Sequence, residues 1–190
     1  MRGKTIEMPN SRSIEKSSGQ LLSQPLYTHE QRKIRDESVW TLVQGILAPV
    51  QFLIFLVSLW LVVSYLRTGE GESAATISVV IKTLALYTIM ITGAIWEKVV
   101  FGRYLFAPAF YWEDVFSMLV IGLHTAYLAA LFTGALGTQN LMLLALAAYA
   151  AYVINAGQFI WKLRMARLDH AARQQDASFD SPSNIAGATQ

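Results

Sequence analysis

The chain has 190 residues, of which 54% are hydrophobic and only 15% are charged, whereas about a quarter of the residues in an average soluble domain are charged. The mean hydropathy of +0.38 is positive although both ends are polar, so the apolar residues are concentrated in the middle. This composition argues against an ordinary soluble globule and against a disordered chain. The absence of cysteine excludes disulfide frameworks, thiolate metal sites and cysteine nucleophiles. The net charge is +2, and the sequence has no basic stripe that would suggest a nucleic-acid partner.

Polar stretches at both ends frame a single expected domain, residues 26–167. Residues 1–25 are polar and lack a hydrophobic period, so we expect a disordered tail there, and we expect a second one over residues 168–190. Thr28 and Gln31 have the spacing of a capping box, which predicts the start of a polar helix. We expect this helix to run directly into the first apolar segment.

Four apolar segments lie between the tails. They cover residues 39–66, 74–96, 109–133 and 141–161. A helix needs about 20 residues to cross the apolar core of a bilayer, and each segment meets this length. A buried soluble bundle is the alternative, but four separate runs of this length rarely occur in a soluble fold. The sequence therefore predicts an all-α integral membrane protein with four transmembrane helices.

The connections between these segments predict the topology. They are short, so consecutive helices should be antiparallel neighbours in an up-down bundle. Lys and Arg concentrate in both tails and in the second connection, while the first connection has only Arg67 and the third has none. The positive-inside rule then places both termini and the 97–114 connection in the cytoplasm. The tryptophans lie near the ends of the spans, as an aromatic belt would place them.

Polar residues recur every seven positions in the first span, at Gln44, Gln51, Ser58 and Tyr65. Seven residues are close to two helical turns, so these side chains should form one stripe, which either faces a ligand cavity or hydrogen-bonds to a neighbouring helix. In the second span, Lys82 either extends its side chain outward to the membrane surface or is buried opposite a ligand carboxylate or a tyrosine. The fourth span has a polar row that we interpret as a packing seam: Tyr149, Tyr152, Asn155 and Gln158.

Glu113, Ser117 and His124 share one face of the third span, because spacings of four and seven residues return to nearly the same helical angle. His124 lies nine residues beyond Val115, which places its imidazole roughly 13 Å deep at about 1.5 Å per residue, near the bilayer centre. An imidazole at this depth can ligate a metal such as the Mg of a porphyrin, move a proton or hydrogen-bond a neighbouring helix.

The connection between the second and third spans holds the densest chemistry. Glu97 ends one helix and Glu113 and Asp114 begin the next, so the antiparallel arrangement should bring three carboxyl groups together. Neighbouring carboxyl groups compete for a proton, and a carboxyl that stays protonated at neutral pH can serve as a general acid. Alternatively, these acids favour the helix dipole, face water, or pair with Lys98 and Arg103. The aromatic residues of the segment are either belt residues or walls for a flat conjugated ligand.

Four stretches of the sequence resemble the vinyl bacteriochlorophyllide hydratase family. They are LYTHEQR at 26–32, VWTLVQGILAP at 39–49, residues 86–102 with the string GAIWEKVVFG, and LFAPAFYWEDVFS at 105–117. The resemblance runs from about Leu26 to about Arg167 and leaves out both tails. It implies a hydro-lyase of bacteriochlorophyll synthesis in the bacterial inner (intracytoplasmic) membrane, which adds water to the C3 vinyl group of chlorophyllide a or its bacteriochlorin relative to give a 1-hydroxyethyl group.

Hydration of a vinyl group needs an acid for the terminal carbon, a base for the water and a flat apolar slot, and it needs no cofactor besides the Mg that the substrate carries. We predict Glu113 as the acid, with Asp114 or Glu97 as its partner and as the base. His124 is the predicted axial ligand to the substrate Mg, or a second proton carrier. The other predicted substrate contacts are Gln44 and Gln51 for water or a ring carbonyl, Lys98 and Arg103 for the free propionate, and Trp96, Phe110, Trp112 and Ser117 beside the ring.

Two other classes of function compete with this hypothesis. A non-catalytic pigment carrier or photosystem assembly protein would share the bundle, the aromatic residues and His124, but would not need clustered carboxylates. A small transporter is a weaker alternative, because one lysine and one histidine make a poor pathway and no inverted repeat is evident. The expected partners are the pigment substrate, the lipid bilayer, and either neighbouring enzymes of pigment synthesis or further copies of the chain.

Overall fold

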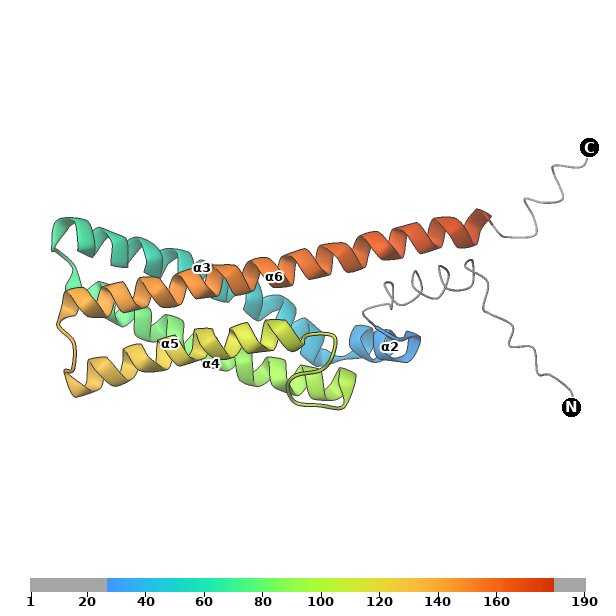
Figure 1. Cartoon of the computed structure of the whole chain (residues 1–190), viewed down its shortest axis with the longest axis horizontal. Coiled ribbons are helices and arrows are strands. Elements are labelled where there is room, and N and C mark those ends of the chain that lie inside the picture. Colours follow the sequence, from blue (N-terminus) through green and yellow to red (C-terminus); the bar gives the residue numbers. More distant parts are fainter. Residues whose placement is uncertain (1–26, 180–190) are drawn as a thin grey trace, which may run out of the picture.

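The computed structural model describes residues 27–179, and these fold into helices without any strand (Figure 1). The predicted tail over residues 1–25 lies outside this range. The helices in chain order are α2 (His29–Glu37), α3 (Val39–Thr68), α4 (Glu72–Phe101), α5 (Tyr111–Thr133) and α6 (Thr138–Phe179).

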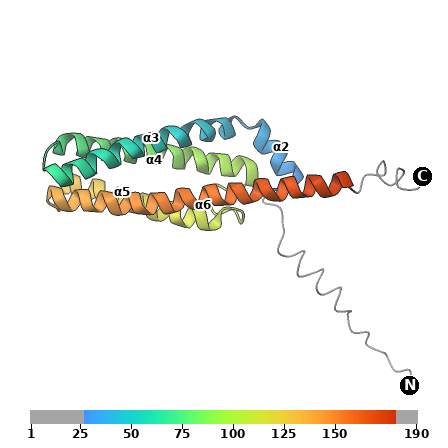
Figure 2. The ribbon, with the colours of Figure 1, turned by 90° about the horizontal axis from the view of Figure 1, so that it is seen from above.

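Four of these helices are long and apolar enough to cross a membrane, which confirms the predicted all-α class and its four apolar segments. The helices α3 to α6 alternate in direction and pack side by side (Figures 1 and 2), with the closest pairing between α3 and α4 and between α5 and α6. Large apolar side chains such as Leu42, Trp60, Ile91 and Phe132 are exposed on the outside of the bundle. An apolar exterior of this extent suits contact with lipid.

The capping box at the start of α2 is confirmed, because the Thr28 hydroxyl accepts from the Gln31 backbone and the Gln31 side chain accepts from the Thr28 backbone. The expectation that α2 continues into the first span is wrong. Ser38 has extended backbone angles, and its backbone N–H donates to the Arg35 carbonyl while its hydroxyl accepts from the Trp40 N–H. Ser38 therefore ends α2 and caps α3, which allows α2 to turn away from the bundle axis.

The predicted boundary of the second tail is also wrong, since α6 continues to Phe179 well beyond the apolar segment. Residues 162–179 contain no proline or glycine and are rich in Ala, Leu, Arg and Gln, which favour a helix. The extension of α6 beyond the bundle is visible in Figures 1 and 2. Residues 180–190 of the predicted tail lie outside the described range.

Polar contacts cross the centre of the bundle. Ser58 of α3 hydrogen-bonds both Ser78 of α4 and Tyr149 of α6. Gln44, from the same stripe as Ser58, donates to the Thr92 hydroxyl over 2.7 Å. These two members of the stripe therefore hydrogen-bond between helices, which was one of its two interpretations.

Lys82 does not extend to the membrane surface. Its side chain is completely buried, with Nζ 3.7 Å from the centroid of the Tyr152 ring and 5.9 Å from that of Phe55. The residue points inward because its position on α4 faces α3 and α6. Of the two alternatives, the structure has the buried lysine beside a tyrosine.

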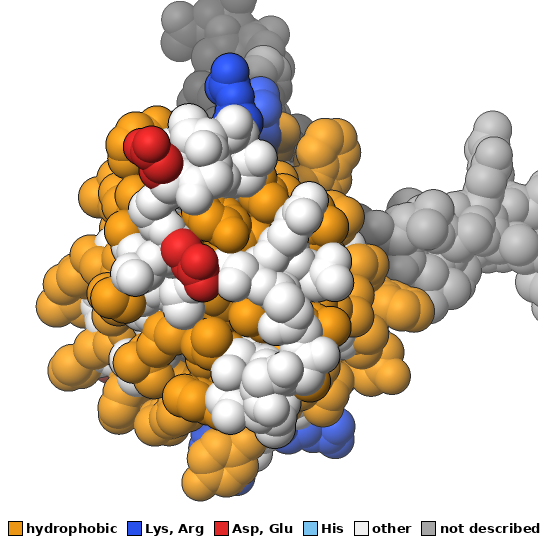
Figure 3. All heavy atoms as spheres, turned by 90° about the vertical axis from the view of Figure 1, so that its left-hand side faces the viewer, with side chains coloured by type: hydrophobic (Ala, Val, Ile, Leu, Met, Phe, Trp, Pro, Cys, Tyr) orange, Lys and Arg blue, Asp and Glu red, His pale blue; other side chains and the backbone are white. Residues whose placement is uncertain are grey.

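The two ends of the bundle differ. At one end the connections α3–α4 and α5–α6 are short turns, and Gly69 and Gly134 close their helices with positive φ angles of 74° and 65°. This end face carries few charged side chains (Figure 3). The other end holds α2, the extension of α6 and the longer connection between α4 and α5, residues 102–110 (Figure 1).

Candidate active site

The 102–110 loop is held by two carboxylates from the helices that it joins. The Phe106 backbone N–H donates to Asp114 Oδ2 over 2.7 Å, and the Ala107 N–H donates to Glu97 Oε1 over 2.6 Å. Phe106 has a φ of 60°, which is uncommon for a residue with a side chain. The hydrogen bond from the Phe106 N–H to Asp114 offsets part of the cost of that conformation.

The predicted gathering of carboxyl groups is confirmed in its geometry. Glu97, Glu113 and Asp114 are all buried, with exposed fractions of 4%, 6% and 7%. The side chains of Glu97 and Asp114 interact directly with each other beneath the loop. The Glu113 side chain points toward α6 instead of the loop, because it lies on the face of α5 that is turned toward α6.

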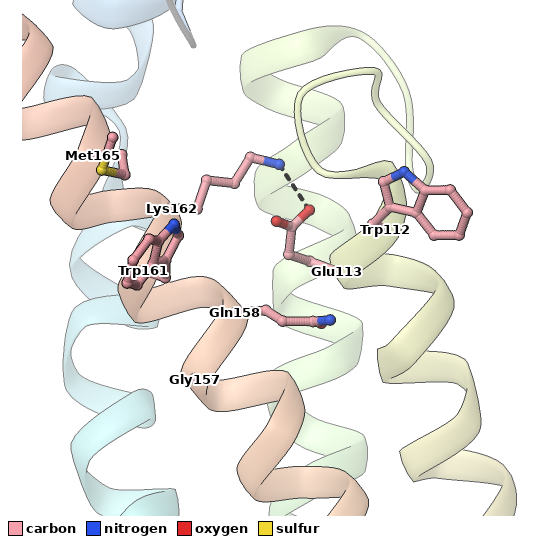
Figure 4. A pocket seen from close by; sticks show the side chains of 7 residues that line it. All are labelled: Trp112, Glu113, Gly157, Gln158, Trp161, Lys162 and Met165. Carbon is pink, nitrogen blue, oxygen red and sulfur yellow. Dashed lines mark hydrogen bonds and ion pairs between the residues drawn. The ribbon is translucent and has the colours of Figure 1, made fainter.

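Glu113 forms an ion pair with Lys162 of α6, with 2.8 Å between Oε2 and Nζ (Figure 4). The basic partners considered from the sequence are placed elsewhere. Lys98 Nζ donates to the Gly102 carbonyl over 2.8 Å, and Arg103 is exposed on the loop. Lys162 is the first basic residue after the fourth apolar segment, a signal that could have marked it as a partner for the start of the antiparallel α5.

A pocket of about 570 Å³ opens beside this ion pair (Figure 4). Its volume falls in the range of about 300–1,000 Å³ that is usual for small-molecule sites. It lies between α5 and α6 and is lined by Trp112, Glu113, Gly157, Gln158, Trp161, Lys162 and Met165. Trp112 and Trp161 are exposed by 68% and 71%, so two flat apolar side chains stand at its rim.

The lining also shows what the sequence reasoning missed. Gln158, Trp161 and Lys162 were not among the predicted site residues, although all three come from one stretch of α6. A Cβ atom added at Gly157 would meet no atom within 4 Å, so the wall of the pocket is open at that position.

Two of the predicted ring walls belong to packing inside the protein. Phe110 is 4% exposed and stacks on Phe159 of α6, and Trp96 packs edge-on against Phe110. Trp96 Nε1 also donates to the Thr41 hydroxyl over 2.9 Å. Of the three predicted aromatic walls, Trp112 is the one that lines the pocket.

The aromatic cluster continues to Tyr27, whose ring stacks on Phe101. Burial raises the pKa of the Tyr27 hydroxyl above its usual value, and the Arg35 guanidinium, 4.7 Å from the ring centroid, opposes this rise. These contacts attach the start of the described chain to the end of the bundle that carries the loop.

The remaining predicted contacts lie on the inner faces of the helices. Gln51 is buried on α3 with 4% of its surface exposed, and Gln44 is engaged by Thr92. The Ser117 hydroxyl accepts a hydrogen bond of 2.9 Å from Asn155 Nδ2 on α6. Ser117 therefore links α5 to α6 one turn beyond Glu113.

His124 is fully buried in the middle of α5. Its Nδ1 lies 2.8 Å from the Val120 carbonyl, and its Nε2 has no hydrogen-bond partner among the described residues. The Tyr149 ring packs against it with 5.8 Å between centroids. The described residues contain no cluster of three or more acidic or histidine side chains that could hold a metal ion. Ligation of the substrate Mg by Nε2 stays a prediction.

The sequence was compared with known families and proteins. The profile of the 2-vinyl bacteriochlorophyllide hydratase family matches residues 27–165, which include all four apolar helices and the pocket. This chain belongs to that family. The 2-vinyl bacteriochlorophyllide hydratase of Cereibacter sphaeroides is 73% identical over 150 residues, covering 78% of this chain and 92% of the relative. That of Rhodobacter capsulatus is 71% identical over 147 residues, covering 77% of this chain and 85% of the relative. No solved structure matches the chain.

Proposed function

We propose that this chain is a hydro-lyase of bacteriochlorophyll synthesis that adds water to the C3 vinyl group of chlorophyllide a or 3-vinyl bacteriochlorophyllide a, giving a 3-(1-hydroxyethyl) group. The family and the names of both relatives support hydration of a vinyl group. One observation supports the placement of the site: the Glu113 carboxyl faces an apolar pocket flanked by two exposed tryptophans. The macrocycle lies against Trp112 and Trp161, with its vinyl group toward Glu113.

At rest the ion pair with Lys162 leaves Glu113 ionised, so its carboxylate first takes up a proton from water and then transfers this proton to the terminal carbon of the vinyl group. The π electrons of the double bond form the new C–H bond, and the positive charge left on the carbon next to the ring is delocalised into the macrocycle. A water oxygen then forms a bond to that carbon. The Glu113 carboxylate takes up one proton of this water, so the acid is restored and the sum is the addition of one water molecule.

The positive charge of Lys162 stabilises the ionised form of Glu113. Its ammonium group lies 2.8 Å from Glu113 Oε2 and therefore stabilises the carboxylate that exists between the two proton transfers. Glu97 and Asp114 act as positioning residues, because each accepts a backbone N–H of the 102–110 loop. This loop leads directly into α5, whose first turn carries Trp112 and Glu113, so the position of the loop sets the position of the acid.

We propose further that the chain lies in the bacterial inner membrane, with both termini and the site at the cytoplasmic surface. The four long apolar helices support a membrane location. The 102–110 loop, which carries Arg103, lies at the same end of the bundle as Lys98, α2 and the extension of α6 (Figure 1). Most Lys and Arg residues of the described range belong to these elements. Because the pocket opens on the side of the bundle between α5 and α6, a pigment dissolved in the membrane can reach it laterally.

A Glu113→Gln variant tests the proposal. Its amide cannot donate a carboxylic proton, so hydration of chlorophyllide a in detergent should fall by about 100-fold or more, while the pigment still binds. The reaction is monitored through the blue shift of pigment absorption that accompanies loss of the vinyl conjugation. Glu72→Gln is the matched control, since Glu72 accepts from Thr138 at the opposite end of the bundle and lies outside the pocket.

A Glu113→Gln protein that hydrates at the parental rate would remove Glu113 from the acid role. A parental protein that binds the pigment but never changes its spectrum would instead support a pigment carrier. The two results are separable because the second concerns the unaltered chain.

A further inference from the structure

The facing sides of α5 and α6 are linked by polar contacts at two levels. Asn155 Nδ2 donates to Ser117 Oγ over 2.9 Å, and Lys162 Nζ donates to Glu113 Oε2 over 2.8 Å. Asn155, Gln158 and Lys162 are spaced by three and four residues, so they share one face of α6. Gln158 thus lies between the two linked levels.

Gln158 has no such partner on α5. The residues of α5 between Glu113 and Ser117 are Asp114, which accepts from Phe106, followed by the apolar Val115 and Phe116. The Oε1 atom of Gln158 is buried and accepts no hydrogen bond from any described residue. Figure 4 shows the Gln158 amide extending from α6 across the pocket, next to Glu113.

A buried amide oxygen without a donor is costly, and native proteins leave few of them. The chemistry of this atom selects its ligand, because an acceptor requires a hydrogen-bond donor. The carbonyl and carboxylate oxygens of a chlorophyllide are acceptors and cannot satisfy it. Water, the second reactant of the proposed hydration, is a small molecule that can donate this hydrogen bond.

We propose that Gln158 binds the reacting water and, together with Glu113, fixes its orientation. One O–H of the water donates to Gln158 Oε1 and the other faces the Glu113 carboxylate, so that an oxygen lone pair is directed at the carbon that carries the positive charge. When the C–O bond forms, the proton on the Glu113 side passes to the carboxylate, and the proton on the Gln158 side stays on the new hydroxyl. This inference rests on the proposed hydratase function.

The test uses Gln158→Met, which keeps the length of the side chain and removes the acceptor. The full chain in detergent is given chlorophyllide a in water that contains methanol, and the hydroxyethyl and methoxyethyl products are separated by mass. We expect kcat to fall about 10- to 100-fold with little change in the KM for pigment. The ratio of methanol addition to water addition should rise several-fold, because methanol and water then compete without an ordered water site.

Two further variants isolate the role of the acceptor. Gln158→Glu keeps an oxygen acceptor at the same length, so its product ratio should stay near the parental ratio. Gln139→Met removes a glutamine that is exposed at the start of α6, at the opposite end of the bundle from the pocket, and it should leave kcat and the product ratio unchanged. Pigment binding shows whether each variant is folded, and Gln158→Leu replaces Gln158→Met if the latter fails to bind.

A folded Gln158→Met protein with parental kcat and parental product ratio overturns the inference. That result leaves the proposed function intact, because the parental chain still hydrates. If the parental chain forms no hydrated product, the proposed function fails first, so the two failures are distinguishable.

Discussion

Lys82 is a fully buried cation in the centre of a bundle of apolar helices. Its Nζ has no hydrogen-bond partner among the described residues and lies over the Tyr152 ring. The sequence allowed either an outward or a buried lysine, because both faces of this span are apolar. The neighbouring helices determine which face of a uniformly apolar helix points into the bundle. The sequence of the helix alone does not contain that information.

Replacing Lys82 by methionine should preserve the bundle. Methionine keeps most of the side-chain volume and removes a group whose burial costs free energy unless it is paired. We expect the thermal midpoint of the purified Lys82→Met protein to equal or exceed the parental value. Lys82→Ala, which leaves a cavity in the same place, should lower it, since large-to-small substitutions in a core cost about 2–5 kcal/mol. A midpoint for Lys82→Met well below the parental midpoint would show that the ammonium itself stabilises the fold.

At the scale of helices and loops, the apolar segments were predictable and their ends were less so. The four spans are long uninterrupted apolar runs, so their existence followed from hydropathy. The break at Ser38 was missed because a polar helix can continue through a serine, and only the packing of α2 against α4 shows that it does not. The length of α6 was missed because polar residues suggested a tail while their helix propensity favoured a longer helix.

The residues of the candidate site also fall into those that could be predicted from the sequence and those that could not. The carboxylates Glu97, Glu113 and Asp114 could be predicted, because they sit at the ends of two consecutive helices and the chain brings these ends together. Lys162 could have been marked only by its position as the first basic residue after the fourth apolar segment. Gln158 and Trp161 could not be predicted, because their place in the pocket depends on the rotation of α6 about its axis. That rotation is fixed by long-range contacts such as Asn155 with Ser117.

The 102–110 loop should depend on Asp114. In Asp114→Ala the Phe106 N–H loses its acceptor, and a hydrogen bond to a charged group contributes about 1.5–3 kcal/mol. We expect amide hydrogen exchange at Phe106 to accelerate by about 10- to 150-fold, which is that free energy converted to a ratio of rates. Ser117→Ala, which removes a contact of α5 with α6, is the control and should leave the exchange of Phe106 unchanged. Equal exchange at Phe106 in the Asp114→Ala and parental proteins would contradict this account of the loop.

For the whole molecule, the structure places the carboxylate site, the 102–110 loop and both ends of the described chain at one end of the bundle (Figures 1 and 2). Because the chain has no cysteine, single cysteines can report its orientation in the membrane. In intact spheroplasts, a membrane-impermeant maleimide should label Glu70→Cys in the α3–α4 turn and should label Arg103→Cys only after permeabilisation. The cysteine-free parental chain is the control, and the reverse labelling pattern would invert the proposed orientation.

The central claim is that the pocket between α5 and α6 holds the vinyl pigment, and it can be tested by filling the pocket. Gly157 lines the pocket, and Gly122 on α5 does not. A Cβ atom added at either glycine meets nothing within 4 Å, so a side chain can leave the backbone without a clash at both positions. The measurement is the rate of chlorophyllide hydration by Gly157→Phe and by Gly122→Phe, with equal amounts of folded protein. The account predicts that Gly157→Phe loses hydration and Gly122→Phe keeps the parental rate; parental hydration by Gly157→Phe would contradict it.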